Sequence, residues 1–335
     1  MAAGTDRHMG CDYTQSRNAL STEKSRVVIA PTRENICAVI VTYHPDRELP
    51  QRVERIASQV QHVVIVDNHS DPSTVAMLKA LSPRLNLRLF LNEENLGIAT
   101  ALNQGMAEAS RLGASWALLL DQDTVPFESM VSVFGQVYEE YPEKETLAVI
   151  GSNFLEVSAP GGRPALTVAA GATWAEQVTV ITSGSLLSIP LFHVVGPFRD
   201  ELFIDEVDTE YCLRARTLGF TTVVSREPLM AHSVGIATSR RFLWRTVRPS
   251  NHSAFRWYYM IRNPIVLTRE YWRAEPRWVT TNLYIRLKLM VKALLYESDR
   301  RAKLQRMLLG GWHGLRGRLG RDGRHRNGRH HDGSA

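Results

Sequence analysis

Several features that define common protein classes are missing from this sequence. Its three cysteines, Cys11, Cys37 and Cys212, are an odd count at unrelated spacings, and they form no CxxC pair. This usage argues against a disulfide scaffold or a zinc site and is typical of a reducing compartment. No apolar run reaches the roughly 18 residues that a membrane-spanning helix needs. The polar stretch from Met1 to Asn35 lacks the apolar centre of a signal peptide, so we expect a cytoplasmic protein.

Two glycine-rich nucleotide signatures are also missing. The sequence contains neither the GxGxxG of dinucleotide-binding folds nor the GxxxxGK[ST] of P-loop proteins. The first predicted strand ends in Thr42-Tyr43-His44-Pro45, which has no glycine that would let a pyrophosphate approach the backbone closely. A nucleotide diphosphate bound here must therefore be neutralised in another way.

The positive charge is concentrated at one end of the chain. The 335 residues carry a net charge of +6, with the hydrophobic fraction of 44% usual for a globular protein. Residues 300–335 contain ten Lys or Arg and two Asp, a net charge of +8, which leaves 6 − 8 = −2 for the rest. The last stretch, Gly320 to Ala335, is rich in Gly, Arg and His, and we expect it to be disordered. Such a tail can bind nucleic acid or an anionic membrane face, or it can be a solvated terminus without a partner.

Strand-like and helix-like segments alternate after the polar start. Ile98 to Leu112 has the apolar spacing of a helix, and four short apolar runs have the composition of buried strands. This alternation predicts an α/β fold, with a mainly parallel sheet flanked by helices, in which ligands bind at the carboxyl ends of the strands. Polar residues follow all four runs. The predicted strands are Ile36 to Tyr43, Val63 to Val66, Asn86 to Leu91 and Trp116 to Leu120.

The strongest chemical signal follows the fourth predicted strand. Asp121 and Asp123 lie one residue apart in the loop that leaves it, so both carboxylates can turn toward one divalent cation. Mg²⁺ and Mn²⁺ prefer such oxygen ligands and keep coordination positions for substrate phosphates. This pair is a means of neutralising a diphosphate without a glycine-rich loop.

Seven short motifs follow one another between Ile36 and Gly320: Val41-Thr42-Tyr43, Val66-Asp67-Asn68-x-Ser70, Glu94-Asn95-Leu96-Gly97, Leu120-Asp121-Gln122-Asp123, Thr182-Ser183-Gly184-Ser185, Leu202-Phe203-Ile204-Asp205-x-Val207-Asp208 and Tyr258-Tyr259-x-x-Arg262-Asn263. Their order and spacing resemble the family 2 inverting glycosyltransferases, which have the GT-A fold. The Asp-Gln-Asp form, together with the later motifs, is more narrowly similar to the bacterial rhamnosyltransferases of that family.

The resemblance implies roles for residues at the strand ends. Asp67 would bond the pyrimidine or the ribose and Asn68 would help shape that pocket, with the Asn95-Leu96-Gly97 turn beneath the base and ribose. Asp121 and Asp123 would hold the cation, with His232 as a third ligand, although a histidine can also simply cap a strand. The expected nucleotide-sugar pocket comprises Thr42, Tyr43, Asp67, Asn68, Asn95, Gly97, Asn103 and Gln122.

An inverting transfer needs a carboxylate base for the acceptor hydroxyl. In this family an acidic pair precedes a helix, and here Val207-Asp208 stands in its place, so Asp208 inherits the role of base. Asp205 and Glu210 are the second choices. Acids at a helix start are also favoured by the helix dipole alone. Val207 stands where the family usually has a second acid beside the base, so the base lacks that neighbour here.

Other residues are expected near the sugar or the acceptor. Ser183 and Gly184 would form a wall beside them, or a plain strand turn, and Trp174 and Arg199 are further candidates. His44 and His69 depart from the family pattern near the nucleotide pocket.

The C-terminal third predicts a helical extension. Thr280 to Tyr296 and Leu304 to Leu315 are largely apolar with interspersed Arg and Lys. Such helices can lie on a membrane surface, or they can pack on the catalytic domain as core helices. We expect four parts: an N-terminal extension (1–34), a GT-A catalytic domain (35–240), a helical region (241–319) and a basic tail (320–335).

The resemblance implies a metal-dependent transfer of L-rhamnose from dTDP-β-L-rhamnose to a lipid-linked glycan or glycolipid, at the inner face of the cytoplasmic membrane. The alternatives are another nucleotide-sugar donor, or a nucleic-acid-binding protein that acts through its tail. A sugar nucleotidyltransferase would need a glycine-rich basic signature at the first strand, which is missing.

Overall fold

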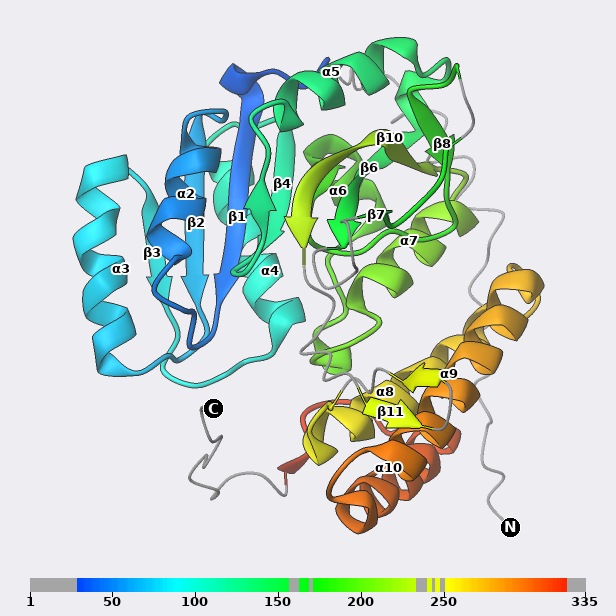
Figure 1. Ribbon diagram of the computed structural model, residues 1–335. Coiled ribbons are helices and arrows are strands. Elements are labelled where there is room, and N and C mark those ends of the chain that lie inside the picture. Colours follow the sequence, from blue (N-terminus) through cyan, green and yellow to red (C-terminus); the bar gives the residue numbers. More distant parts are fainter. Residues whose placement is uncertain are drawn as a thin grey trace, which may run out of the picture.

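The main sheet has a parallel half and a mixed half (Figure 1). The computed structural model describes residues 29–156, 163–168, 171–232, 240–242, 245–247 and 251–323. Within these residues the sheet has ten strands, with β3-β2-β1-β4-β9-β6-β10-β5 as its main path. The strands on this path are β1 (Ile36–Thr42), β2 (His62–Asp67), β3 (Arg88–Leu91), β4 (Trp116–Asp121), β5 (Val125–Pro126), β6 (Leu147–Glu156), β9 (Ser185–Ser188) and β10 (Thr221–His232).

The parallel half confirms the predicted strand ends. β1 runs parallel to β2 and β4, with Thr42 beside Asp67 and Val41 beside Asp121. Four polar strand ends therefore meet at one edge. The reversal at β9, which is antiparallel to β4 and to β6, is a feature that the alternation of segments did not predict. Two short strands lie off the path, β7 (Arg163–Pro164) on β6 and β8 (Trp174–Glu176) on β10.

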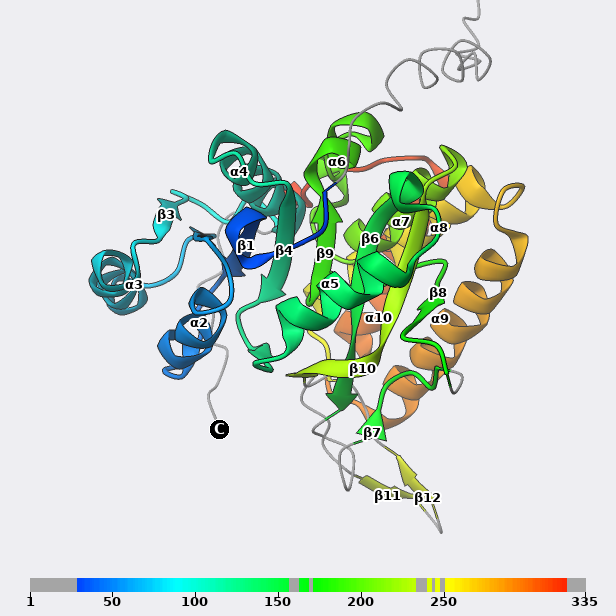
Figure 2. The same ribbon diagram turned by 90° about the horizontal axis from the view of Figure 1, so that it is seen from above.

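Helices cover both faces of the sheet (Figure 2). Alternate residues of β1 point to opposite faces, so Ile36, Ala38 and Ile40 join one apolar cluster while Cys37 and Val39 join the other. The first cluster includes α2 (Leu49–Ala57), α3 (Pro72–Leu85) and α5 (Met130–Glu140); the second includes α4 (Ile98–Arg111), α6 (Ile189–Val195) and α7 (Val207–Thr217).

The C-terminal region is helical, as expected. After a small hairpin of β11 (Arg240–Phe242) and β12 (Arg245–Val247), it contains α8 (Ala254–Tyr271), α9 (Pro276–Tyr296) and α10 (Arg300–Leu315). Two glycines let α10 approach α8 closely, since a Cβ at Gly310 would lie 2.4 Å from the Tyr258 carbonyl oxygen and one at Gly314 would lie 2.8 Å from that of Arg262. None of the helices in the described residues combines the length and the apolar composition that a bilayer span requires.

The described residues extend slightly beyond the expected catalytic and helical regions. Trp116 donates its indole N–H to the Ile29 carbonyl oxygen at 2.8 Å. At the other end, the Asp322 backbone N–H donates to the Tyr259 hydroxyl at 3.0 Å, and Asp322 is buried. The first residues of the expected basic tail therefore pack on α8, whereas residues 324–335 lie outside the described part.

Candidate active site

Gln122 fixes the loop that carries the two acids. Its side-chain oxygen accepts the Tyr43 backbone N–H at 2.7 Å, and its side-chain nitrogen donates to the Tyr43 carbonyl at 3.1 Å. Arg52 of α2 also donates to the Gln122 carbonyl at 3.1 Å. The amide of Gln122 thus joins the ends of β1 and β4, with Asp121 half-buried and Asp123 exposed on either side of it.

Asp67 is buried and rigidly held at the end of β2. Its carboxylate accepts hydrogen bonds from the Thr42 hydroxyl at 2.8 Å and from the Ser70 backbone N–H and hydroxyl at 2.8 and 2.6 Å. Both partners belong to motifs recognised in the sequence. These bonds orient the carboxylate at the edge of the sheet where the nucleotide was predicted.

Asn68 ties this strand end to the next turn. It donates to the Asn95 side chain at 3.0 Å and to the Gly97 carbonyl at 3.1 Å, and it accepts from the Leu96 backbone N–H at 2.9 Å. Gly97 has φ +88°, and a Cβ there would lie 2.6 Å from Phe203. Only glycine meets both requirements, the left-handed backbone and the close approach.

Thr182 and Ser183 contact both the predicted base and the predicted cation site. The Ser183 hydroxyl accepts the Asp121 backbone N–H at 3.1 Å, while the Thr182 backbone N–H donates to the Asp208 carboxylate at 2.8 Å. Gly184, at φ +72°, turns the chain so that its own N–H donates to the Leu119 carbonyl of β4 at 2.8 Å. One turn therefore places the expected base beside the expected cation site.

The surroundings of Asp208 suit a general base. Burial raises the pKa of this carboxyl, while hydrogen bonds from Thr209 and Thr182 oppose the rise by stabilising the ionised form. The Thr182 hydroxyl donates to Asp208 at 3.2 Å, and the Thr209 backbone N–H donates at 2.7 Å. A carboxylate that is partly desolvated holds a proton more readily than one in water.

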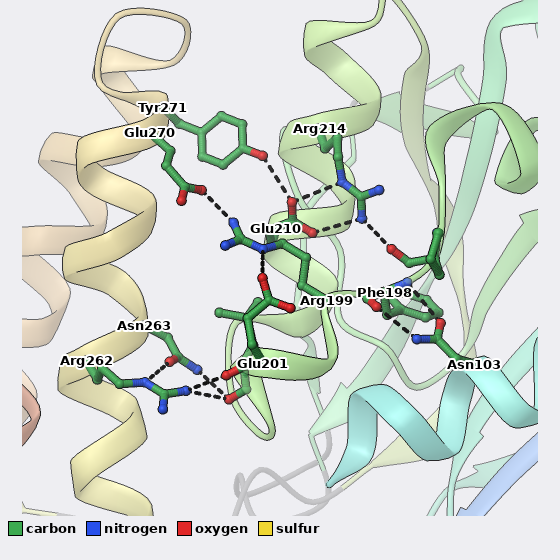
Figure 3. Close-up of polar contacts among 12 residues, drawn as sticks. Asn103, Phe198, Arg199, Glu201, Glu210, Arg214, Arg262, Asn263, Glu270 and Tyr271 are labelled. Carbon is green, nitrogen blue, oxygen red and sulfur yellow. Dashed lines mark hydrogen bonds and ion pairs between the residues drawn. The ribbon is translucent and has the colours of Figure 1, made fainter. Parts of the chain in front are cut away.

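The loop before Asp208 is held by α8. Phe203, Asp205 and Glu206 all adopt φ near +65°, at +66°, +64° and +65°, which is strained for residues with side chains. Asn263 donates to the carbonyls of Leu202, Ile204 and Asp205 at 3.1, 2.9 and 2.8 Å. Arg262, fully buried, donates to the carbonyls of Glu201 and Leu202, both at 3.0 Å (Figure 3). The Arg262-Asn263 motif is therefore an anchor for this loop.

Two further arginines of the C-terminal helices pair with acids of the loop. Arg256 of α8 forms a two-pronged ion pair with Asp205, at 3.1 Å from Nε and 2.9 Å from Nη2. Arg286 of α9 pairs with Glu206, whose side chain is 2% exposed. Burial raises the pKa of Glu206, and the Arg286 guanidinium acts in the opposite direction. Sequence reasoning missed these arginines, because nothing local to them marks their distant partners.

Four of the predicted site residues are engaged in internal contacts. Asn103 donates to the Phe198 carbonyl at 2.8 Å, and Glu210 accepts from Arg214 at 3.0 Å and from Tyr271 at 3.1 Å (Figure 3). Arg199 pairs with Glu270 of α8 at 2.6 Å. The Trp174 ring packs edge-on against Tyr141 with centroids 4.9 Å apart. These contacts give the four side chains structural partners, and their roles at the site stay predictions.

The donor set fits a cation that also binds a diphosphate. Within the described residues there is no group of three or more His, Cys, Asp or Glu side chains that could hold a metal. Asp121 and Asp123 supply two carboxylates, which is the usual protein share of a Mg²⁺ site completed by substrate phosphates. The backbone of His232 pairs with Glu156 of β6, and its side chain lies outside the described part, so its ligand role stays a prediction.

Comparisons with known proteins support one enzyme class, the glycosyltransferases. The model of the family described as Glycosyl transferase family 2 matches residues 37–159, the segment that contains β1 to β6 and the Asp121 and Asp123 pair. Over 248 residues the chain is 29% identical to dTDP-rhamnosyl transferase RfbF of Shigella flexneri, covering 70% of this chain and 80% of that protein.

Solved structures show the same fold at low identity. A mannosyltransferase from Pyrobaculum calidifontis, in complex with GDP-Man and Mn²⁺, matches with a TM-score of 0.54 and 15% identity, covering 90% of this chain and 94% of that one. S. aureus TarS 1–349, in complex with UDP-GlcNAc, also gives 0.54, with 14% identity over 82% and 79% of the two chains. The chain therefore has the GT-A fold that the sequence predicted.

Proposed function

We propose that this glycosyltransferase is metal-dependent and inverting, and that it transfers L-rhamnose from dTDP-β-L-rhamnose to a hydroxyl of a lipid-linked glycan or glycolipid. One observation carries the proposal: the Thr182-Ser183 turn contacts the backbone of Asp121 on one side and the carboxylate of Asp208 on the other. A cation site and a base so close together suit a single displacement at the anomeric carbon.

Each residue then has a defined part in the reaction. Asp67 and Asn68, with the Asn95 to Gly97 turn, bind the nucleoside, and Asp121 and Asp123 hold Mg²⁺ or Mn²⁺. The cation, when bound, offsets the charge that develops on the leaving diphosphate. Asp208 takes the proton of the acceptor hydroxyl as its oxygen attacks C1 of the sugar. The carbon–oxygen bond to the diphosphate breaks on the opposite face, so a β-linked donor gives an α-L-rhamnoside.

The donor assignment is supported by the similarity to dTDP-rhamnosyl transferase RfbF. Two proteins of the same fold were solved with GDP-Man and UDP-GlcNAc, which supports a nucleotide sugar in general. A different sugar nucleotide is therefore the main alternative. A lipid-borne acceptor would place the enzyme on the inner face of the cytoplasmic membrane.

A donor panel tests the proposal. The purified chain is mixed with dTDP-β-L-rhamnose, UDP-GlcNAc or GDP-mannose and a rhamnose acceptor, with Mg²⁺, with Mn²⁺ or with a chelator, and nucleotide release is measured. We expect turnover with dTDP-rhamnose that the chelator and Asp123→Ala abolish. The matched control, Glu139→Ala, removes an exposed acid of α5 and should be fully active. Turnover without metal, or full activity of Asp123→Ala, would contradict the proposal.

A further inference from the structure

The exposure of its apolar residues bears on whether α9 packs on the catalytic domain as a core helix or presents an apolar side to a membrane surface. α9 buries only Val279 and Ala293 against its neighbours. Four of its large apolar side chains, spaced four residues apart, are exposed: Leu283 (45%), Leu287 (60%), Val291 (49%) and Leu295 (56%). Residues at this spacing lie on one face of a helix. α9 therefore presents a second apolar side to solvent, in addition to the side on which Trp278, Leu289 and Met290 pack against the rest of the protein.

The next helix repeats the arrangement. On α10 the exposed apolar residues are Leu304 (42%), Leu308 (67%), Trp312 (53%) and Leu315 (64%), again three or four positions apart. The two helices pack on each other and on α8 through Ala293, Met307 and Trp257. Single exposed leucines are ordinary, but exposed apolar stripes on adjacent helices mark an interaction surface. We call these eight residues the leucine-rich surface.

The charges on the same helices indicate what covers this surface. α9 carries Arg277, Arg286, Lys288 and Lys292, and α10 carries Arg300, Arg301, Lys303 and Arg306, while neither helix contains an acidic residue. Arg286, Lys303 and Arg306 pair with acids elsewhere in the protein. The cations on the exposed side include Lys288 and Arg301. Two copies of such a surface would bring like charges together, whereas an anionic bilayer attracts the cations and accepts the leucines.

We propose that the leucine-rich surface docks on an anionic lipid bilayer, with α9 and α10 lying along the interface. The 21 residues of α9 span about 30 Å, and the leucines enter the acyl region while Lys288 and Arg301 reach the phosphates. Arg286 on another side of α9 pairs with Glu206 of the loop before Asp208. The docked face is thus linked to the loop of the base, which suits a lipid-borne acceptor. Only this last point rests on the proposed function.

Vesicle flotation with the full chain tests the docking. We expect the protein to float with vesicles of equal parts phosphatidylcholine and phosphatidylglycerol, and less with phosphatidylcholine alone. Leu287→Glu should lower the partition coefficient about tenfold for both vesicles. Arg301→Glu should lower it about fivefold or more for the anionic vesicles alone, in a salt-dependent manner.

Two variants away from α9 and α10 serve as matched controls. Leu166→Glu adds a charge at another exposed leucine (38%), and Arg226→Glu reverses an exposed charge on β10; both should float like the unaltered chain. The proposal is overturned if the unaltered chain stays unbound, if Leu287→Glu floats normally, or if the surface instead forms a dimer in sedimentation that Leu287→Glu abolishes. Flotation does not depend on turnover, so docking without any sugar transfer would refute the proposed function and leave this inference standing.

Discussion

At the residue scale, the candidate site depends on a few side chains whose polar atoms form hydrogen bonds within the protein. The Asp67 carboxylate accepts hydrogen bonds from Thr42 and Ser70, and the Gln122 amide bonds both the N–H and the carbonyl of Tyr43. Asp208 is oriented by Thr182 and Thr209. Orientation by hydrogen bonds leaves little rearrangement for the moment of reaction, which is how such sites lower a barrier.

The first residue-scale prediction concerns pH. Thr182→Val removes a hydroxyl that favours the ionised form of Asp208, so the pKa of Asp208 should rise further above its usual value. Because the base must be ionised, the acidic limb of kcat/KM should move to higher pH. The measurement is a pH profile of transfer. Thr217→Val, at the end of α7, should leave the profile unchanged, and an unmoved or lowered limb in Thr182→Val would refute the assignment.

A second prediction concerns the turn at Gly97. Gly97→Ala should lower the free energy of unfolding by more than Gly113→Ala, which costs about 1 kcal/mol. Both glycines have positive φ, +88° and +78°, but only at Gly97 would the new methyl meet another residue, Phe203, at 2.6 Å. Urea unfolding measures the difference. Donor KM should rise in Gly97→Ala alone, and equal losses of stability would show that the contact with Phe203 is unimportant.

Sequence reasoning can propose residues whose chemistry is local, but it cannot reveal contacts between distant segments. Asp121 and Asp123 could be recognised because two acids follow an apolar strand, and Gly97 because it ends a polar turn. The engagement of Asn103 and Arg199 by Phe198 and Glu270 depends on contacts about 70 to 100 residues away in sequence. Residue type alone cannot reveal such contacts.

At the element scale, the loop before Asp208 is shared between the catalytic fold and the C-terminal helices. Asn263 and Arg262 of α8 satisfy its carbonyls, and Arg286 of α9 neutralises Glu206. The parallel strands could be predicted from apolar runs, since each run is a local signal. The reversal of β9 and this anchoring could not, because both depend on pairing between distant segments.

The element-scale prediction is a double-mutant cycle across the Glu206–Arg286 pair. Arg286→Gln leaves a buried carboxylate without its cation and should lower the free energy of unfolding by about 3 kcal/mol. Adding Glu206→Gln should restore much of that loss, because the unpaired charge is removed. Urea unfolding of the four proteins gives the coupling. Additive effects would show that the pair does not hold the loop.

At the scale of the whole molecule, the C-terminal helices, drawn below the sheet in Figure 1, contact the catalytic fold. The Gly320 backbone N–H donates to the Glu201 carbonyl at 2.8 Å, its carbonyl accepts from Arg262, and Asp322 pairs with Arg306. The basic charge of the chain thus begins on helices that pack against the site and continues into the tail. A protein that acted only through a basic tail would not need this attachment.

The whole-molecule prediction separates these roles by two truncations. Removing residues 324–335 should leave the free energy of unfolding and the transfer rate unchanged. Removing residues 320–335 should reduce both, because Arg262 and Arg306 lose their partners. Thermal unfolding and a transfer assay measure the two effects. Loss of transfer in the shorter truncation would show that the tail itself takes part in the reaction.

The central claim is that Asp208 is the base beside a cation site that binds the donor. The most direct measurement compares Asp208→Asn with the unaltered enzyme for both kcat and dTDP-rhamnose affinity in the presence of Mn²⁺. We predict a fall in kcat of about a hundredfold to ten-thousandfold with donor affinity unchanged. Transfer by Asp208→Asn at the rate of the unaltered enzyme would contradict the account.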